Sequence, residues 1–267
     1  MMKLKKEMNT NDSNVLDGII DIHIHTAPDV RSRLETDIEA ARSAKNEHMH
    51  GVVIKSHDEP TSGRAKIAST ITNFPVYGGV VLNHGVGGLN PGAVQSCADM
   101  GGKFVWFPTT SVSSIEMDWE KIEEIIHLAA ENNMILLTGH LKPANILDLI
   151  DMARSHGIWK LIVNHPLTRV VGATLDEQVE MSKYAYLEHC FVACMKLHDN
   201  LDPVHISDSI RKVGANRCIL ATDFGQIHNP KPVDGMKMYI STLIDKGIKK
   251  SEIQTMTVDN PKKLVEG

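Results

Sequence analysis

The sequence predicts a single (β/α)8 barrel, an α/β fold in which parallel strands alternate with helices around a closed ring. Short runs rich in Val, Ile, Leu and Phe, as buried parallel strands are, alternate with longer amphipathic segments. The runs end about every 28 residues, enough for one strand, one helix and two short loops. About eight such units fit the chain, and no linker or low-complexity segment divides them. An open doubly wound sheet is the competing fold.

Each predicted strand is an apolar run that ends in polar residues. In chain order the runs cover residues 18–25, 51–57, 76–84, 103–108, 134–140, 160–165, 185–190 and 218–223.

The segments between the strands carry helical periodicity or helix-start signals. In order they cover residues 37–47, 91–100, 119–132, 143–155, 175–184, 203–213 and 235–246, and a short last helix starts at Asn260. Apolar residues share one face in three of them: Ile38, Ala41 and Ala44 in the first, Ile122, Ile125 and Ile126 in the third, and Ile146 and Ile150 in the fourth. Pro91 begins the second, Gly157 is a C-cap for the fourth, and Thr174 with Glu177 caps the fifth.

Composition bounds the classes of function. The 267 residues contain 28 Lys and Arg, 33 Asp and Glu and 14 His, for a net charge of −5. That balance offers no basic surface for nucleic acid, and no apolar run reaches the ~18 residues of a membrane helix. Four cysteines without a CxxC pair indicate reduced thiols and a cytoplasmic protein. The polar residues 1–16 are expected to form a mobile tail before one barrel domain, 17–267.

Histidines fall at the predicted strand ends, where active sites of such barrels lie. His23 and His25 share one side of the first strand because side chains alternate. His140 ends the fifth strand, His165 the sixth and Asp223 the eighth. Any one of these is most simply a structural residue, but their joint placement predicts a metal site formed by His23, His25, His140, His165 and Asp223.

These residues resemble the amidohydrolase superfamily of metal-dependent hydrolases. The resemblance rests on His-x-His after strand 1, His after strands 5 and 6 and Asp after strand 8, and it extends from Gly18 to Val265. Segments 77–83, 86–91 and 105–109 are similar to an uncharacterised branch of that superfamily. The resemblance implies a barrel that hydrolyses a C–N or ester-type bond of a small molecule.

The sequence departs from the superfamily at strand 4. Binuclear members often carry a carboxylated Lys or a Glu there to bridge two metals, whereas this strand ends in Trp106, Phe107 and Pro108. The departure favours one ion, although two remain compatible with the sequence. Lys55, on strand 2, is either a substitute bridge or a contact to a substrate anion.

The donor types favour Zn2+, while Mn2+ and Fe2+ also suit nitrogen and carboxylate ligands. Asp223 is the expected proton acceptor, and His165 is expected either to bind metal or to stabilise an oxyanion. Arg31, Lys55, His57, His84 and Glu188 are the expected substrate-binding residues, with ordinary polar packing as the alternative. His57, His84 and Glu188 could instead orient the metal ligands.

Three other functions remain open at this stage. They are a decarboxylase with one metal, a phosphoesterase of the related His-x-His barrels, and a barrel that binds a metal or metabolite without turnover. The expected partner is a small molecule, and a homo-oligomer is compatible with the fold.

Overall fold

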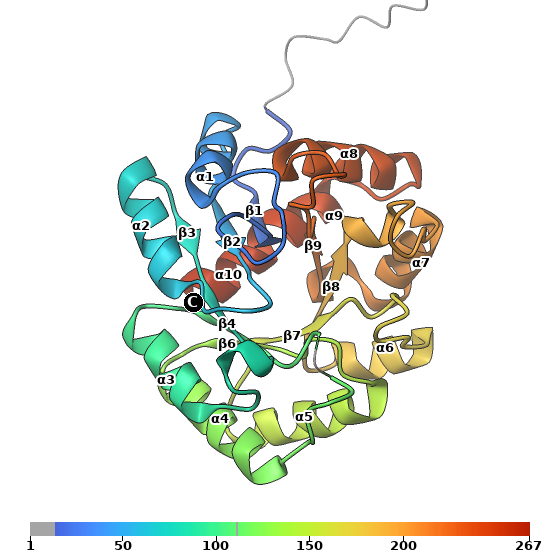
Figure 1. Ribbon diagram of the computed structural model, residues 1–267. Helices are drawn as coiled ribbons and strands as arrows, with labels where there is room; N and C mark the ends of the chain where they lie inside the picture. The colour runs from blue at the N-terminus through green and yellow to red at the C-terminus, as the bar shows by residue number, and fades with distance from the viewer. Residues whose placement is uncertain (1–13, 111) are drawn as a thin grey trace, which may run out of the picture.

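The computed structural model describes residues 14–110 and 112–267, in which parallel strands form a ring surrounded by helices (Figure 1). The strands are β1 Ile20–Ile24, β2 Gly51–Ile54, β3 Val76–Tyr77, β4 Gly79–Val81, β5 Phe104–Trp106, β6 Ile135–Leu137, β7 Leu161–Asn164, β8 Tyr186–Cys190 and β9 Cys218–Ala221. The helices are α1 Asp37–Asn46, α2 Ser62–Thr72, α3 Pro91–Asp99, α4 Trp119–Glu131, α5 Pro143–Ser155, α6 Leu175–Ser182, α7 Pro203–Val213, α8 Pro232–Asp245, α9 Lys250–Gln254 and α10 Asn260–Glu266.

The strands pair in parallel as two ladders, β1-β2-β3 and β4-β5-β6-β7-β8-β9. β3 and β4 lie within one predicted run and are separated only by Gly78, so the chain itself joins the ladders there. At the other seam, β1 and β9 meet through an isolated bridge between Ile24 and Phe224. The ring is therefore a barrel without continuous strand pairing, and the predicted (β/α)8 class is confirmed.

Alternation along the strands separates two apolar layers. In β5, Phe104 and Trp106 belong to one core cluster, whereas Val105 packs in the other with Ile122 and Ile126 of α4. Successive side chains of a strand point to opposite faces, and the strands from β4 to β8 each contribute to both layers. The same rule decides below which side chains enter the site.

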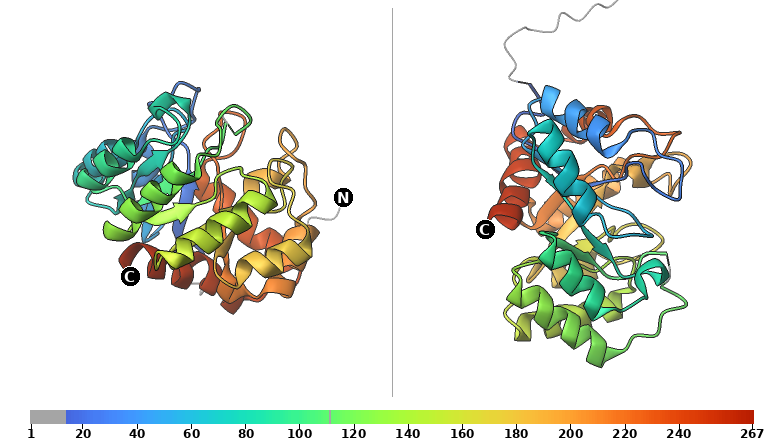
Figure 2. Two further views of the ribbon diagram at one scale, coloured as in Figure 1. Left: turned by 90° about the horizontal axis from the view of Figure 1, so that it is seen from below. Right: turned by 60° about the vertical axis from the view of Figure 1, so that its left-hand side comes forward.

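The end of the barrel where the strands begin is closed by α10. Just before β5 and β7, Lys103 and Lys160 donate from Nζ to the carbonyls of Val265 and Gly267, each at 2.5 Å. Figure 2 places this last helix below the strands. The opposite end, where the strands finish, carries the histidines.

Several boundaries differ from the expectation. Each predicted run contains a strand, but the strands stop short of their polar ends, and β4 ends at Val81, well before His84. α2 lies between residues 57 and 76, where no helix was expected. Residues 1–13 of the expected tail lie outside the described residues, whereas Leu16 is fully buried, so the folded part begins before residue 17. Within the described chain, no helix has the length and apolar character to cross a membrane.

Candidate metal centre

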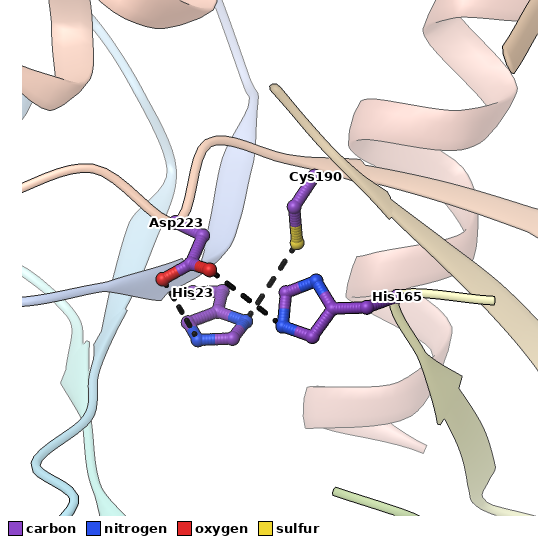
Figure 3. A group of neighbouring side chains, drawn as sticks. All are labelled: His23, His165, Cys190 and Asp223. Atoms are coloured by element: carbon purple, nitrogen blue, oxygen red, sulfur yellow. Dashed lines mark hydrogen bonds and ion pairs between the residues drawn. The ribbon is translucent and has the colours of Figure 1, made fainter. Parts of the chain in front are cut away.

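Four side chains from separate strands converge at the carboxyl end of the barrel. His23 lies in β1, Cys190 ends β8, His165 directly follows β7 and Asp223 follows β9. One potential ligand atom of each lies within 4.8 Å of those of the others, and Figure 3 shows the four facing a common centre. Three of the four are buried. Among the described residues this is the group of His, Cys, Asp and Glu close enough to hold an ion.

Asp223 is the hub of this group. Its Oδ1 lies 2.9 Å from Nε2 of His25 and 3.3 Å from Nε2 of His23, and its Oδ2 lies 3.6 Å from Nε2 of His165. Asp223 and His165 both adopt left-handed backbone conformations, with φ of 53° and 49°. Asp and His are among the residues enriched in that conformation. These turns at the strand ends direct both side chains toward the barrel axis.

A buried carboxylate fixes the ring of His23. Nδ1 of His23 lies 3.2 and 3.3 Å from the two oxygens of Glu188, which is fully buried. Asn164 donates from Nδ2 to Glu188 at 2.5 Å and accepts at Oδ1 from the backbone N–H of Gly139 at 2.9 Å. Four strand ends are thereby joined by one hydrogen-bond chain.

This chain leaves two acceptors facing each other. With Nδ1–H of His23 donated to Glu188, Nε2 carries the lone pair, yet it lies 3.3 Å from a carboxylate oxygen of Asp223. Two acceptors at that separation require a cation between or beside them. Lys55, 2% exposed, places Nζ 3.1 Å from the same Nε2 and supplies such a charge. The position is therefore built for a cation.

Burial keeps the surrounding imidazoles neutral. It lowers the pKa of His25 to about 3, of His140 to about 2 and of His165 to about 4. Burial acts to raise the pKa of Glu188 and of Asp223, but the neighbouring histidines and hydrogen bonds together outweigh it, so the pKa of both carboxyls lies below its usual range. Neutral imidazoles beside ionised carboxylates are the protonation states that a divalent metal requires.

One ring nitrogen of His165 lacks a hydrogen-bond partner among the described residues. Nδ1 of His165 is buried and, within the part of the chain that the structure describes, makes no hydrogen bond. Its other ring nitrogen, Nε2, faces the group and lies 3.6 Å from Oδ2 of Asp223. The residues present, two imidazoles, a carboxylate and a thiol, therefore fit a divalent transition metal.

The remaining predicted residues lie at different distances from this group. His140 packs edge-on against His165, with ring centroids 5.3 Å apart, and His57 stacks on His25 at 4.9 Å. Arg31 is 44% exposed and pairs with Asp58 at 2.5 Å. His84 is exposed and bonds Ser114 at 2.8 Å, outside the cluster.

Sequence reasoning did not single out Cys190, Asn164 or Arg33. Cys190 lies 3.8 Å from Nδ1 of His23 and shares a strand face with Glu188, two residues earlier, a spacing that could have revealed it. His189, between them, points outward to Ser209 of α7 at 3.2 Å. Trp106 ends β5, the fourth strand of the expected barrel, and its ring centroid lies 6.4 Å from that of His23. The superfamily pattern has a bridging ligand at the end of that strand.

A family model, described as a family of unknown function (DUF6282), matches residues 18–121 and 116–188, more than half of the chain. A search of curated proteins gave no match.

Solved structures share the fold at low sequence identity. A probable 2-pyrone-4,6-dicarboxylic acid hydrolase from Acinetobacter baumannii, with citric acid bound, has a TM-score of 0.66 at 13% identity, over 94% of this chain and 100% of its own. A phosphotriesterase homology protein from Escherichia coli, with phosphate in its active site, has a TM-score of 0.63 at 13% identity, over 93% and 98%. A beta-aspartyl dipeptidase from Fervidobacterium islandicum has a TM-score of 0.64 at 14% identity, over 93% and 73%.

Proposed function

Because the chain belongs to DUF6282, a family of unknown function, and has the barrel fold of several hydrolases, we propose that it is a metal-dependent hydrolase of the amidohydrolase type. Its substrate is a small molecule with a C–N or ester-type bond. The observation that carries the proposal is the convergence of His23, His165, Cys190 and Asp223, whose potential ligand atoms lie within 4.8 Å of one another at the carboxyl end of the barrel.

His23, His165 and Asp223 would hold the metal, with His25 and His140 beside them and Cys190 within reach. We propose Zn2+, since imidazole, carboxylate and thiolate all suit it. A divalent metal supplies Lewis-acid activation of water near neutral pH. The four cysteines are free thiols, which supports the expected cytoplasmic location.

The chain's own groups perform the proton transfers. Asp223, whose pKa is held well below its usual range, takes a proton from the attacking water and returns it to the leaving group. The side chain of Asp223 is 14% exposed, so substrate can reach it. Arg31, His57 and His84 follow strands at this end of the barrel and are proposed substrate contacts, as is Lys55, which lies beside His23. For Glu188, which is fully buried and contacts Nδ1 of His23, we propose the other expected role, that of orienting a metal ligand.

Metal analysis of protein purified without a His tag tests the proposal. We expect about one equivalent of Zn2+, removable by a chelator and restored by Zn2+ or Mn2+. Less than about half an equivalent that neither ion restores would contradict it.

A substrate screen of the metal-replete protein with amides, lactones and phosphoesters then ranks the reactions. We expect chelator-sensitive turnover of an amide or a lactone. Turnover of phosphoesters alone would favour the phosphoesterase alternative, and release of CO2 from carboxylated substrates would favour the decarboxylase.

A further inference from the structure

The two histidines of the His-x-His pair have opposite groups on their second ring nitrogens. A neutral imidazole has one N–H donor and one lone pair. A histidine that binds metal offers the lone pair and donates its remaining N–H to a carboxylate, a carbonyl or water. The groups facing both nitrogens therefore tell which nitrogen carries the lone pair, and a metal beside Asp223 needs that lone pair on the nitrogen that faces Asp223.

His23 has the surroundings of a ligand. Glu188 can only accept, so Nδ1 of His23 carries the hydrogen. Lys55 can only donate, so Nε2 carries the lone pair, 3.1 Å from Nζ. The two contacts agree, and both lie in the buried interior.

The position of Glu188 is itself fixed. The backbone N–H of Gly139 must donate, so the atom of Asn164 that it contacts at 2.9 Å is the oxygen. The amide nitrogen of Asn164 then faces Glu188 at 2.5 Å. Glu188, whose pKa is lowered and which is therefore ionised, has only acceptors and accepts from both neighbours.

His25 has the opposite arrangement. Nη2 of Arg33 lies 3.3 Å from Nδ1 of His25, and a guanidinium has no acceptor, so Nδ1 carries the lone pair. Nε2 therefore carries the hydrogen and donates it to Asp223 at 2.9 Å. Asp29 holds Arg33 at 2.9 Å, and the two side chains are 3% and 0% exposed, so this donor is anchored.

We propose that the two histidines have different roles: Glu188 positions His23 as a metal ligand, whereas Arg33 makes His25 a hydrogen-bond donor to Asp223 rather than a ligand. The inference rests on the proposed metal site and departs from the expectation that both histidines bind the ion. Glu188 and Arg33 act as positioning residues, through His23 and His25. His25 then holds one oxygen of Asp223 and leaves the other toward His165.

Nitrogen-15 NMR of histidine-labelled wild-type protein, freed of metal, tests the tautomers directly. We expect His23 with the hydrogen on Nδ1 and His25 with the hydrogen on Nε2. Both rings with the hydrogen on Nδ1 would give two ligand-type histidines and overturn the assignment for His25. This measurement needs no substitution and therefore does not depend on a variant folding.

Zinc binding by variants tests the roles. We expect His25→Gln to keep about one equivalent of Zn2+ and His23→Gln to lose it, as measured by dialysis and metal analysis, with circular dichroism confirming the fold. Glu188→Gln should weaken Zn2+ binding roughly 10–100-fold, the usual effect of removing a ligand's supporting carboxylate. His127→Gln, on the exposed face of α4, is the matched control.

The outcomes separate the two proposals. Wild-type protein that binds no Zn2+ would overturn the proposed function and the ligand role of His23 with it. Wild-type binding that His25→Gln abolishes as fully as His23→Gln would overturn this inference alone. Zinc affinity of Glu188→Gln within about threefold of wild type would overturn the positioning role of Glu188.

In the Co2+-loaded protein, absorption in the visible region reports the coordination sphere apart from any activity. Replacing a ligand changes that spectrum, and replacing a neighbour of the ligands leaves its intensity and band positions close to those of the wild type. We expect the wild-type spectrum in His25→Gln and a lost or changed one in His23→Gln. A changed spectrum in His25→Gln would contradict its assignment as a donor.

Discussion

At the scale of single residues, Asp223 combines three properties that rarely occur together. Its backbone is left-handed, its carboxylate contacts three imidazoles, and it retains 14% exposure. Asn tolerates the left-handed conformation well and keeps one acceptor oxygen, so it separates the charge of Asp223 from its shape.

We therefore expect Asp223→Asn to fold normally and to lose turnover by a factor on the order of 10²–10⁴, the range for removing an acid–base group. Zinc affinity should fall as well, because one anionic donor becomes neutral. Turnover of the substrate identified by the screen, metal content and melting temperature are the measurements, with Asp151→Asn, 78% exposed, as the control. Full activity in Asp223→Asn would exclude it as the proton acceptor.

The sequence predicted the part of this site that depends on residue type and strand end. His23, His25, His165 and Asp223 lie where alternation and strand order placed them, around one centre. Cys190 and Arg33 could not be ranked in this way, since a buried thiol and a loop arginine are usually structural. Their importance depends on what each side chain faces, which is a tertiary property. The role of His84 stays a prediction: it follows an apolar run, but the strand ends earlier, and His84 is exposed and bonds Ser114.

At the scale of elements, turns after the strands determine how the site residues point. Gly139, between β6 and His140, has φ of 60°, and a Cβ there would lie 2.2 Å from the carbonyl oxygen of Phe107. Its N–H also donates to Asn164. Gly157 has a similar φ of 76° but nothing within 4 Å of a Cβ.

Gly139→Ala and Gly157→Ala therefore form a matched pair. Gly157→Ala should cost about 1 kcal/mol, from backbone strain alone. Gly139→Ala should cost about 3 kcal/mol or more, because the added methyl also overlaps backbone atoms, and it should weaken Zn2+ binding by shifting Asn164 and Glu188. Urea unfolding of the metal-free variants measures the difference. Equal costs would show that the turn at Gly139 relaxes freely.

Strands were easier to predict than their limits or the helices of low amphipathicity. Every apolar run contains a strand because burial on both faces leaves a strong signal. In α2, by contrast, Ser62, Gly63 and Thr70 are poor helix formers, and the buried face is made by small residues such as Ala65 and Ala68. α2 is stabilised by packing against α1 and β3. Periodicity in the sequence does not reveal these contacts.

At the scale of the whole molecule, the site lies on the seam where the first and the last strand of the barrel meet. β1 and β9 are joined by the bridge at Ile24 and Phe224, by His25 N–H to the Phe224 carbonyl and by Asp223 N–H to the His23 carbonyl, each of the latter at 2.8 Å. His23 comes from one side of this seam and Asp223 from the other. A metal bound by both residues would therefore cross-link β1 to the segment after β9 and stabilise the closed barrel.

Zinc should consequently stabilise the whole barrel rather than one loop. At a free Zn2+ concentration of about 100 times the dissociation constant, binding contributes about 2.7 kcal/mol to the free energy of unfolding. For a chain of this size that corresponds to a rise in melting temperature of roughly 5–10 °C. Thermal unfolding with Zn2+ and with EDTA measures the shift, and hydrogen exchange should slow at the amides of both β1 and β9. Protection confined to the loops that follow the strands, with an unchanged melting temperature, would mean that the ion does not span the seam.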